Sequence, residues 1–79
     1  MNTKVFYEIV DTEYGMMIDS FSEDELTEKQ ACDKTQEMVN HEKEECSFNL
    51  YKVIREKSNN GDWNYVDEEL IGCFYNEIK

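Results

Sequence analysis

The chain has 79 residues and a formal charge of −11, from 19 Asp and Glu against 8 Lys and Arg. Such a charge repels nucleic acid and anionic membranes, and a chain of this length forms one modest core. Of the residues, 39% are hydrophobic and 13% aromatic, a higher apolar content than is typical of disordered chains. We therefore expect one folded domain over residues 1–79.

The first pattern in the chain predicts a β-hairpin. Two runs rich in β-branched and aromatic residues, KVFYEIV and MMIDSF, flank the turn-forming segment DTEYG, which ends in glycine. Strands bounded by such a polar cluster are typical of a hairpin.

The segment SEDELTEKQACDKTQEMVNHEKEE predicts a helix, because it lacks Gly and Pro and is rich in Glu, Lys and Gln. Two capping boxes mark alternative starts, Ser22 with Glu25 and Thr27 with Gln30. We favour Thr27 as the N-cap, since Leu26 then stands where a hydrophobic staple begins.

An apolar stripe on this helix, expected from about Glu28 to Lys43, predicts how it packs. At 3.6 residues per turn, one side carries Ala31, Thr35, Met38 and Val39, with Cys32 at its margin. The opposite side carries Asp33, Glu37 and His41. Because the stripe is narrow, we expect the helix to lie on a sheet, with Met38 and Val39 buried.

Two further β-rich runs, CSFNLYKVIREK and WNYVDEELIGCFYNEI, surround SNNGD. Asn60 and Gly61 predict a type I′ turn, which requires positive φ at both central residues. That turn would pair Trp63 with Ser58, Tyr65 with Glu56, and Lys52 with Glu69. The element order is therefore β-β-α-β-β, an α+β fold with one antiparallel sheet and a single helix packed on one face.

The same loop can be compared with an EF-type calcium loop in which Gly61 holds the sixth position. Such loops begin with Asp and end with a bidentate Glu, whereas here Glu56 and Asp67 reverse those types. The preceding LYKVIR is also strand-like rather than helical. We therefore favour the turn, and expect no metal and no cofactor.

Catalytic patterns are missing from the sequence, so we expect no enzyme. The single histidine, His41, lies among carboxylates on the polar side of the helix, without a neighbouring nucleophile or metal ligand set. GxSxG, HExxH and glycine-rich phosphate loops are all absent.

The cysteines indicate a reducing compartment. Cys32, Cys46 and Cys73 are widely spaced and form no CxxC pair, as is typical of ordinary thiols. No run approaches the roughly 18 apolar residues of a membrane helix, and the N-terminus lacks the layout of a signal peptide. We expect a soluble, cytoplasmic protein.

Acidic residues cluster in SEDELTE, HEKEE and VDEE. Only the first cluster complements the helix dipole, so the others either add solubility or bind a partner. Carboxylates could replace phosphates in the groove of a nucleic-acid-binding protein, since Asp67 and Glu69 would stand about 6.5–7 Å apart on one strand face, and Asp33 and Glu37 roughly 6 Å apart on the helix.

The candidate binding residues combine these acids with nearby aromatic side chains, which either anchor an interface or pack in the core. They are Asp33, Glu37, Asp67, Glu68, Glu69, Trp63, Tyr65 and Tyr75.

In layout and charge, the hairpin KVFYEIVDTEYG, the helix LTEKQACDKTQEMV and the hairpin LYKVIREKSNNGDWNYV resemble small acidic accessory proteins encoded by bacteriophages. The resemblance covers the whole chain. Some members of that class inhibit restriction enzymes, CRISPR nucleases or DNA-repair enzymes, often by occupying a DNA-binding surface. It implies an anti-defence role in the host cytoplasm.

We therefore expect a non-enzymatic inhibitor or modulator, monomeric or homodimeric, that binds a basic, nucleic-acid-binding protein, with DNA mimicry as the sharpest mechanism. It is not expected to bind nucleic acid or membranes itself. The alternatives are an adaptor or structural subunit without mimicry, and a weak metal-binding or small-ligand module.

Overall fold

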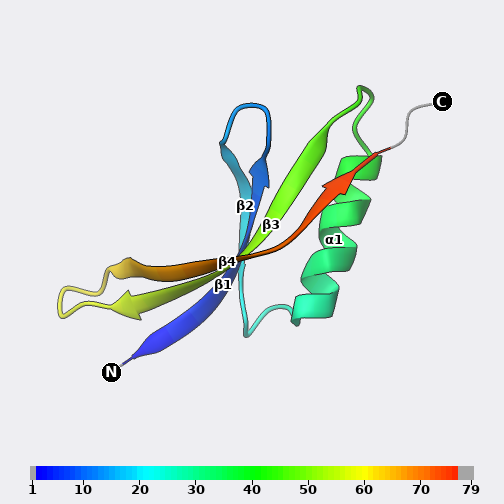
Figure 1. The fold of residues 1–79 in the computed structure, drawn as a ribbon. Coiled ribbons are helices and arrows are strands. Elements are labelled where there is room, and N and C mark those ends of the chain that lie inside the picture. Colours follow the sequence, from blue (N-terminus) through cyan, green and yellow to red (C-terminus); the bar gives the residue numbers. More distant parts are fainter. Residues whose placement is uncertain (1, 77–79) are drawn as a thin grey trace.

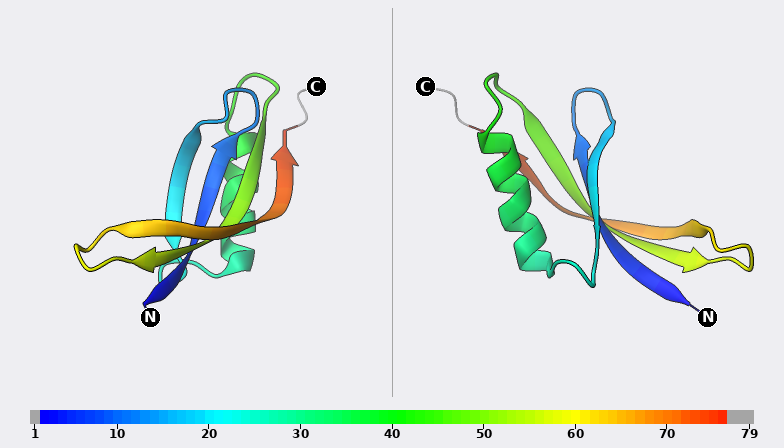
Figure 2. Two further views of the ribbon diagram at one scale, coloured as in Figure 1. Left: turned by 60° about the vertical axis from the view of Figure 1, so that its left-hand side comes forward. Right: turned by 180° about the vertical axis from the view of Figure 1, so that it is seen from behind.

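The computed structural model describes residues 2–76, which form four antiparallel strands and one helix (Figure 1). In chain order these elements are β1 (Thr3–Asp11), β2 (Met17–Ser22), α1 (Glu28–Asn40), β3 (Ser47–Lys57) and β4 (Trp63–Tyr75). The strands form one open sheet in the order β2-β1-β3-β4, and α1 lies on one side of it (Figure 2). The predicted α+β fold is confirmed.

The first hairpin closes through the side chain of Asp11. One carboxylate oxygen of Asp11 accepts the N–H groups of Glu13 at 2.7 Å and Tyr14 at 3.2 Å, an arrangement that starts a turn locally. Gly15 completes the turn with a φ of 67°, a conformation that glycine adopts without steric penalty. The segment DTEYG therefore turns as predicted.

Helix α1 begins where the second capping box predicted. The N–H of Gln30 donates to the Thr27 hydroxyl at 3.2 Å, and the N–H of Thr27 donates to the side chain of Gln30 at 2.9 Å. The helix ends at Asn40, three residues before the expected Lys43, with His41 as its C-cap. Its last turn holds no basic residue, and the acidic residues that follow are unfavourable at the negative end of the helix dipole.

The segment after the helix is held instead by Asn76, which is 6% exposed. Its side-chain amide donates to the carbonyl oxygens of Glu44 at 3.0 Å and Glu42 at 3.4 Å. Its side-chain oxygen accepts the N–H of Cys46 at 2.9 Å. Asn76 thereby ties the α1–β3 connection to the end of β4.

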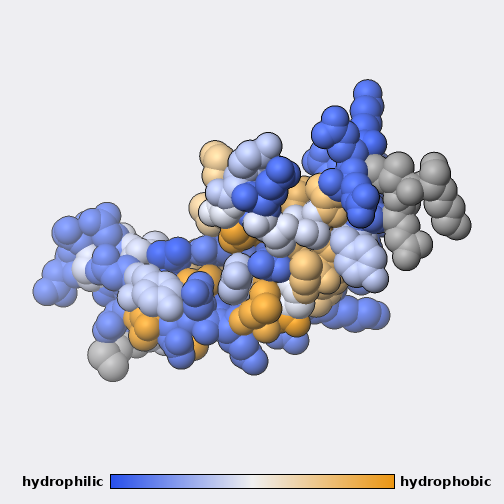
Figure 3. All heavy atoms as spheres, turned by 45° about the horizontal axis from the view of Figure 1, so that its top comes forward, coloured by the Kyte–Doolittle hydropathy of each residue, from blue (hydrophilic) through white to orange (hydrophobic). Residues whose placement is uncertain are grey.

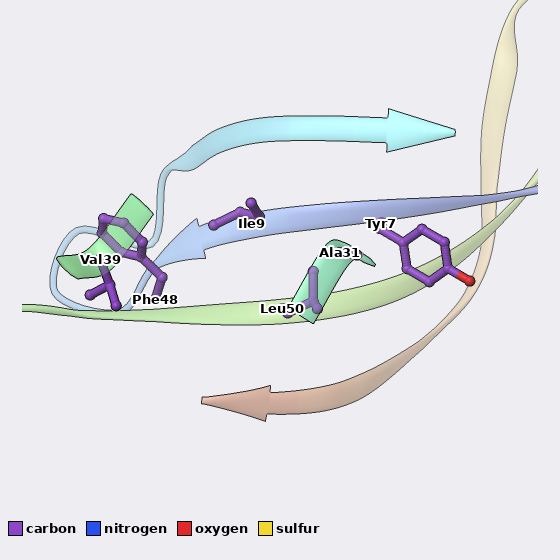
Figure 4. Packing of buried hydrophobic residues seen from close by; sticks show 6 residues of the cluster. All are labelled: Tyr7, Ile9, Ala31, Val39, Phe48 and Leu50. Atoms are coloured by element: carbon purple, nitrogen blue, oxygen red, sulfur yellow. The ribbon is translucent and has the colours of Figure 1, made fainter. Parts of the chain in front are cut away.

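The core lies between α1 and the middle of the sheet (Figure 4). From the helix, the buried residues are Ala31, Thr35 and Val39, spaced four residues apart. From β1 and β3 they are Tyr7, Ile9, Phe48 and Leu50. The predicted stripe is confirmed except at Met38, which is only partly buried and packs at the margin of the core.

The sheet is strongly twisted, and only one end of it is covered by the helix (Figures 1 and 2). The start of β1, the end of β3 and the start of β4 extend past α1, so the molecule measures 50 × 24 × 17 Å. On the side of the sheet facing away from α1, Val53 is also buried, at 2% exposure. A single helix thus leaves a large part of both sheet faces open.

The second hairpin closes through a different turn from the one predicted. The N–H of Ser58 donates to the Asp62 carbonyl at 2.8 Å, and the N–H of Gly61 donates to the Ser58 carbonyl at 3.0 Å. This leaves a loop of residues 59–61, in which Gly61 has a φ of 91° and Asn60 has no positive φ. The type I′ prediction was wrong, because a three-residue loop needs a left-handed residue only at its last position.

The register follows from this loop. Next to the turn, Trp63 pairs with Lys57 and Tyr65 with Arg55, one residue away from the predicted partners. A β-bulge between Tyr65 and Asp67 then inserts one extra residue into β4. Beyond the bulge, the predicted pairing of Lys52 with Glu69 is confirmed.

Candidate functional site

Strand β4 forms one edge of the sheet, and among residues 2–76 its only strand partner is β3. Several large apolar side chains on it are exposed: Tyr65 at 56%, Val66 at 49%, Leu70 at 53% and Tyr75 at 61%. The space-filling view shows apolar residues in separate patches among hydrophilic ones (Figure 3). An exposed strand edge with apolar side chains is a common place for another chain to bind.

The acids Asp67, Glu68 and Glu69 lie between these apolar residues, and all three are exposed. Directly opposite residues of an antiparallel pair share a face. Asp67 and Glu69, opposite Ile54 and Lys52, therefore lie on the face that carries α1, while Glu68 lies on the other face. Within residues 2–76, none of the three carboxylates forms an ion pair.

The backbone of β4 at Glu68 points away from β3. Its N–H donates to a carboxylate oxygen of Asp67 at 2.8 Å, so this donor takes no part in the pairing with β3. The other edge strand repeats the arrangement, with the N–H of Ser20 donating to Asp19 at 2.9 Å. At both edges an Asp side chain occupies an amide that a further strand would otherwise use.

The aromatic candidates divide into two groups. Trp63 is partly buried and packs edge-to-face on Phe6, with ring centroids 5.6 Å apart. The ammonium group of Lys57 lies 5.9 Å from the centre of the Trp63 ring. Trp63 therefore packs within the part of the sheet that extends past α1. Tyr65 and Tyr75 are exposed rather than packed in the core.

Tyr65 is coupled to the acids beside it. Its partial burial and the negative charges of Glu68 and Asp67 raise the pKa of the Tyr65 hydroxyl. Burial and like charge both disfavour the ionised phenolate. Tyr65 therefore stays neutral at physiological pH and remains a hydrogen-bond donor within the acidic segment.

The helix acids form a separate surface. Asp33 and Glu37 are exposed on the side of α1 that faces away from its buried stripe. Glu37 lies 4.0 Å from the imidazole of His41, an exposed pair of small energetic value. The predicted acids therefore occupy two surfaces, one on the helix layer and one on the sheet edge.

A concave region of about 520 Å³ lies at the end of the sheet. Its lining includes Asp11, Glu13, Glu45, Cys46, Cys73 and Tyr75. Burial, with the charges of Glu42 and Asp11, raises the pKa of the Cys46 thiol, which keeps the thiol protonated and a poor nucleophile at neutral pH. Within residues 2–76 there is no group of three side chains suited to hold a metal ion.

Val66 and Leu70 were missed as site residues, although the sequence carries a signal for them. Both belong to apolar doublets, Tyr65-Val66 and Leu70-Ile71, that interrupt the alternation expected of a strand. The two bulges of β4 occur at these doublets. After the second bulge Ile71 packs against the core, while Leu70 remains exposed.

Comparisons with known protein families, with curated proteins and with solved structures found no match to this chain. In the part of the chain that the structure describes, no helix combines the length and apolar character needed to cross a membrane.

Proposed function

We propose that this protein binds a basic, nucleic-acid-binding protein through the edge of β4 and thereby blocks access of nucleic acid to that protein. The observation that supports this most strongly is the segment from Tyr65 to Leu70, where three carboxylates that form no ion pair with residues 2–76 lie between exposed apolar side chains. The cellular role suggested by the resemblance to phage accessory proteins is inhibition of a host enzyme.

The charge of the chain favours such a partner. With a net charge of −11, the protein attracts a positively charged groove over several ångströms and accelerates its association with it. Of the basic residues, Lys4 and Arg55 are already paired with Asp24 and Glu8. Within residues 2–76 the acids of β4 form no such ion pair, and Lys52, opposite Glu69, is the cation paired with this segment across the sheet.

The exposed apolar residues can supply the binding energy that exposed charges provide only weakly. Charged rims set association rate and orientation, whereas buried aromatic and aliphatic side chains provide most of the binding energy. Tyr65 and Leu70 flank the acids and suit this second role. A groove that contacts phosphates through basic residues and bases through apolar surface would meet both features here.

Affinity capture with charge variants tests the proposal. The bait proteins are the parent, a β4 variant with Asp67, Glu68 and Glu69 changed to Lys, and a matched variant with Glu42, Glu44 and Glu45 changed to Lys. The matched variant carries the same change in net charge on exposed residues of the α1–β3 connection. Duplex DNA is then added to the captured proteins as a competitor.

We expect the parent and the matched variant to retain a basic protein that DNA releases, and the β4 variant to lose it. If both variants lose the basic protein equally, the net charge of the chain and not the position of the β4 acids determines binding. Retention by the β4 variant, with DNA bound alongside, would refute the proposal.

A further inference from the structure

We propose that β4 binds an extended segment of its partner as a fifth strand of the sheet, at residues 67–70. This inference rests on the proposed function and specifies its chemistry, namely a segment in which basic and apolar residues alternate.

The backbone of β4 is regular between its two bulges, and one bond to Asp67 must be exchanged for such pairing. Residues 67–70 are paired in regular register with residues 51–54. Because alternate residues of an antiparallel strand direct their N–H and C=O groups to opposite sides, the outward N–H of Glu68 implies that Leu70 also faces outward. An added strand would accept the Glu68 N–H in place of Asp67, whose carboxylate would then be free to bind a cation.

The side chains of this segment define the sequence pattern of the added strand. Asp67 and Glu69 lie on the face that carries α1, whereas Leu70 lies on the other face, opposite Tyr51. Neighbouring side chains on one sheet face contact each other across strands. A segment with Lys or Arg at every second position would place its cations beside Asp67 and Glu69 on one face, and its apolar residues beside Leu70 and the stem of Glu68 on the other.

A second copy of this chain does not fit the same edge. Antiparallel pairing of β4 with itself about Glu68 would bring Asp67, Glu68 and Glu69 of both copies into opposition, and like charges directly opposite destabilise a sheet. Each copy also carries a net charge of −11. Charge complementarity therefore selects a basic strand over self-association.

Four labelled, end-capped hexapeptides test the inference in low salt. The first alternates Lys and Val, and the second has the same composition as a block of Lys followed by a block of Val. The other two are alternating peptides N-methylated at either the Lys or the Val amides. Because only one edge of an added strand pairs with β4, the peptide methylated on that edge should bind at least about tenfold more weakly, since each lost hydrogen bond costs up to about tenfold, and the other should bind as before.

The matching variant of the protein is Glu68→Pro, with Glu68→Val as its control. Both remove the charge, but only proline removes the outward N–H, and an edge strand accommodates proline where that N–H is not used for pairing. We expect Glu68→Pro to bind the alternating peptide about tenfold more weakly than Glu68→Val. If Glu68→Pro fails to fold, the methylated peptides decide the question.

The outcomes separate this inference from the proposed function. If both methylated peptides and the block peptide bind as tightly as the alternating peptide, while the Lys reversal of β4 abolishes binding, strand addition is wrong and the acidic surface stands. If no basic peptide binds and the reversal leaves partner capture unchanged, both fail. Self-association in sedimentation that Glu68→Pro abolishes would replace the basic strand with a second copy.

Discussion

Substitution of Gly61 by Ala should destabilise the protein by about 1 kcal/mol, for reasons of backbone conformation alone. Gly61 has a φ of 91°, and a Cβ placed there would meet no heavy atom within 4 Å. An L-residue in left-handed conformation costs about 1–2 kcal/mol, while the reduced freedom of alanine in the unfolded chain returns about 0.4–1 kcal/mol.

The matched control is Asn60→Ala. Asn60 has no positive φ, and its side-chain oxygen accepts two exposed bonds, one from the Ser58 hydroxyl and a long one from the Asp62 N–H at 3.3 Å. We expect this variant to lose at most about 0.5 kcal/mol, as for an ordinary surface substitution. A type I′ turn would instead require positive φ at both residues and penalise both substitutions alike.

Urea unfolding provides the measurement, since a change in midpoint at constant slope reports stability. For a domain of this size, a loss of 1 kcal/mol also lowers the melting temperature by about 4–8 °C. If Asn60→Ala is as destabilising as Gly61→Ala, the three-residue loop is wrong and the pairing next to the turn must shift with it.

Three further predictions concern the core, a connection and the site. Val39→Ala should cost about 2–3 kcal/mol in urea unfolding, from two lost methyl groups and the cavity they leave under α1; an unchanged midpoint would contradict the helix orientation. Asn76→Asp should cost about 1–3 kcal/mol in thermal unfolding, because a carboxylate cannot donate to the Glu44 carbonyl. An unchanged melting temperature would show that the Asn76 hydrogen bonds do not stabilise the α1–β3 connection. Glu68→Gln should lower the pKa of Tyr65 in an NMR titration without returning it to the ordinary value, because burial is the larger cause. An unchanged pKa would show that the charge of Glu68 does not act on Tyr65. Since the folded pKa of Tyr65 is raised, its stabilising contribution is present below the unfolded value of about 10 and is lost as pH rises through the folded one.

The features that the sequence predicts well depend on local signals. The capping box at Thr27 and the spacing of Ala31, Thr35 and Val39 operate within the helix itself, so they identify both its start and its buried side. The end of α1 was less predictable, because the segment that follows it is held by Asn76, which comes 36 residues after Asn40 in the chain.

The second hairpin shows why register is harder to predict than the existence of strands. An Asn-Gly pair suits a two-residue loop as well as the end of a three-residue loop. The three-residue loop shifts the pairing next to the turn by one residue, and the bulge at Val66 restores the pairing of Lys52 with Glu69. The sequence alone shows neither the loop length nor the bulge. Strand propensity also cannot tell which strand of a sheet lies at the edge or which face a helix covers, and the exposure of Leu70 depends on both.

The most direct test of the proposed binding surface is a ¹H–¹⁵N NMR titration of the labelled protein with the alternating Lys–Val hexapeptide. The largest amide shifts should fall between Tyr65 and Leu70, and the amide proton of Glu68 should change most, as it leaves the Asp67 carboxylate for a carbonyl of the peptide. Shifts concentrated at Asp33 and Glu37, or spread evenly over all acidic clusters, would contradict binding at the edge of β4.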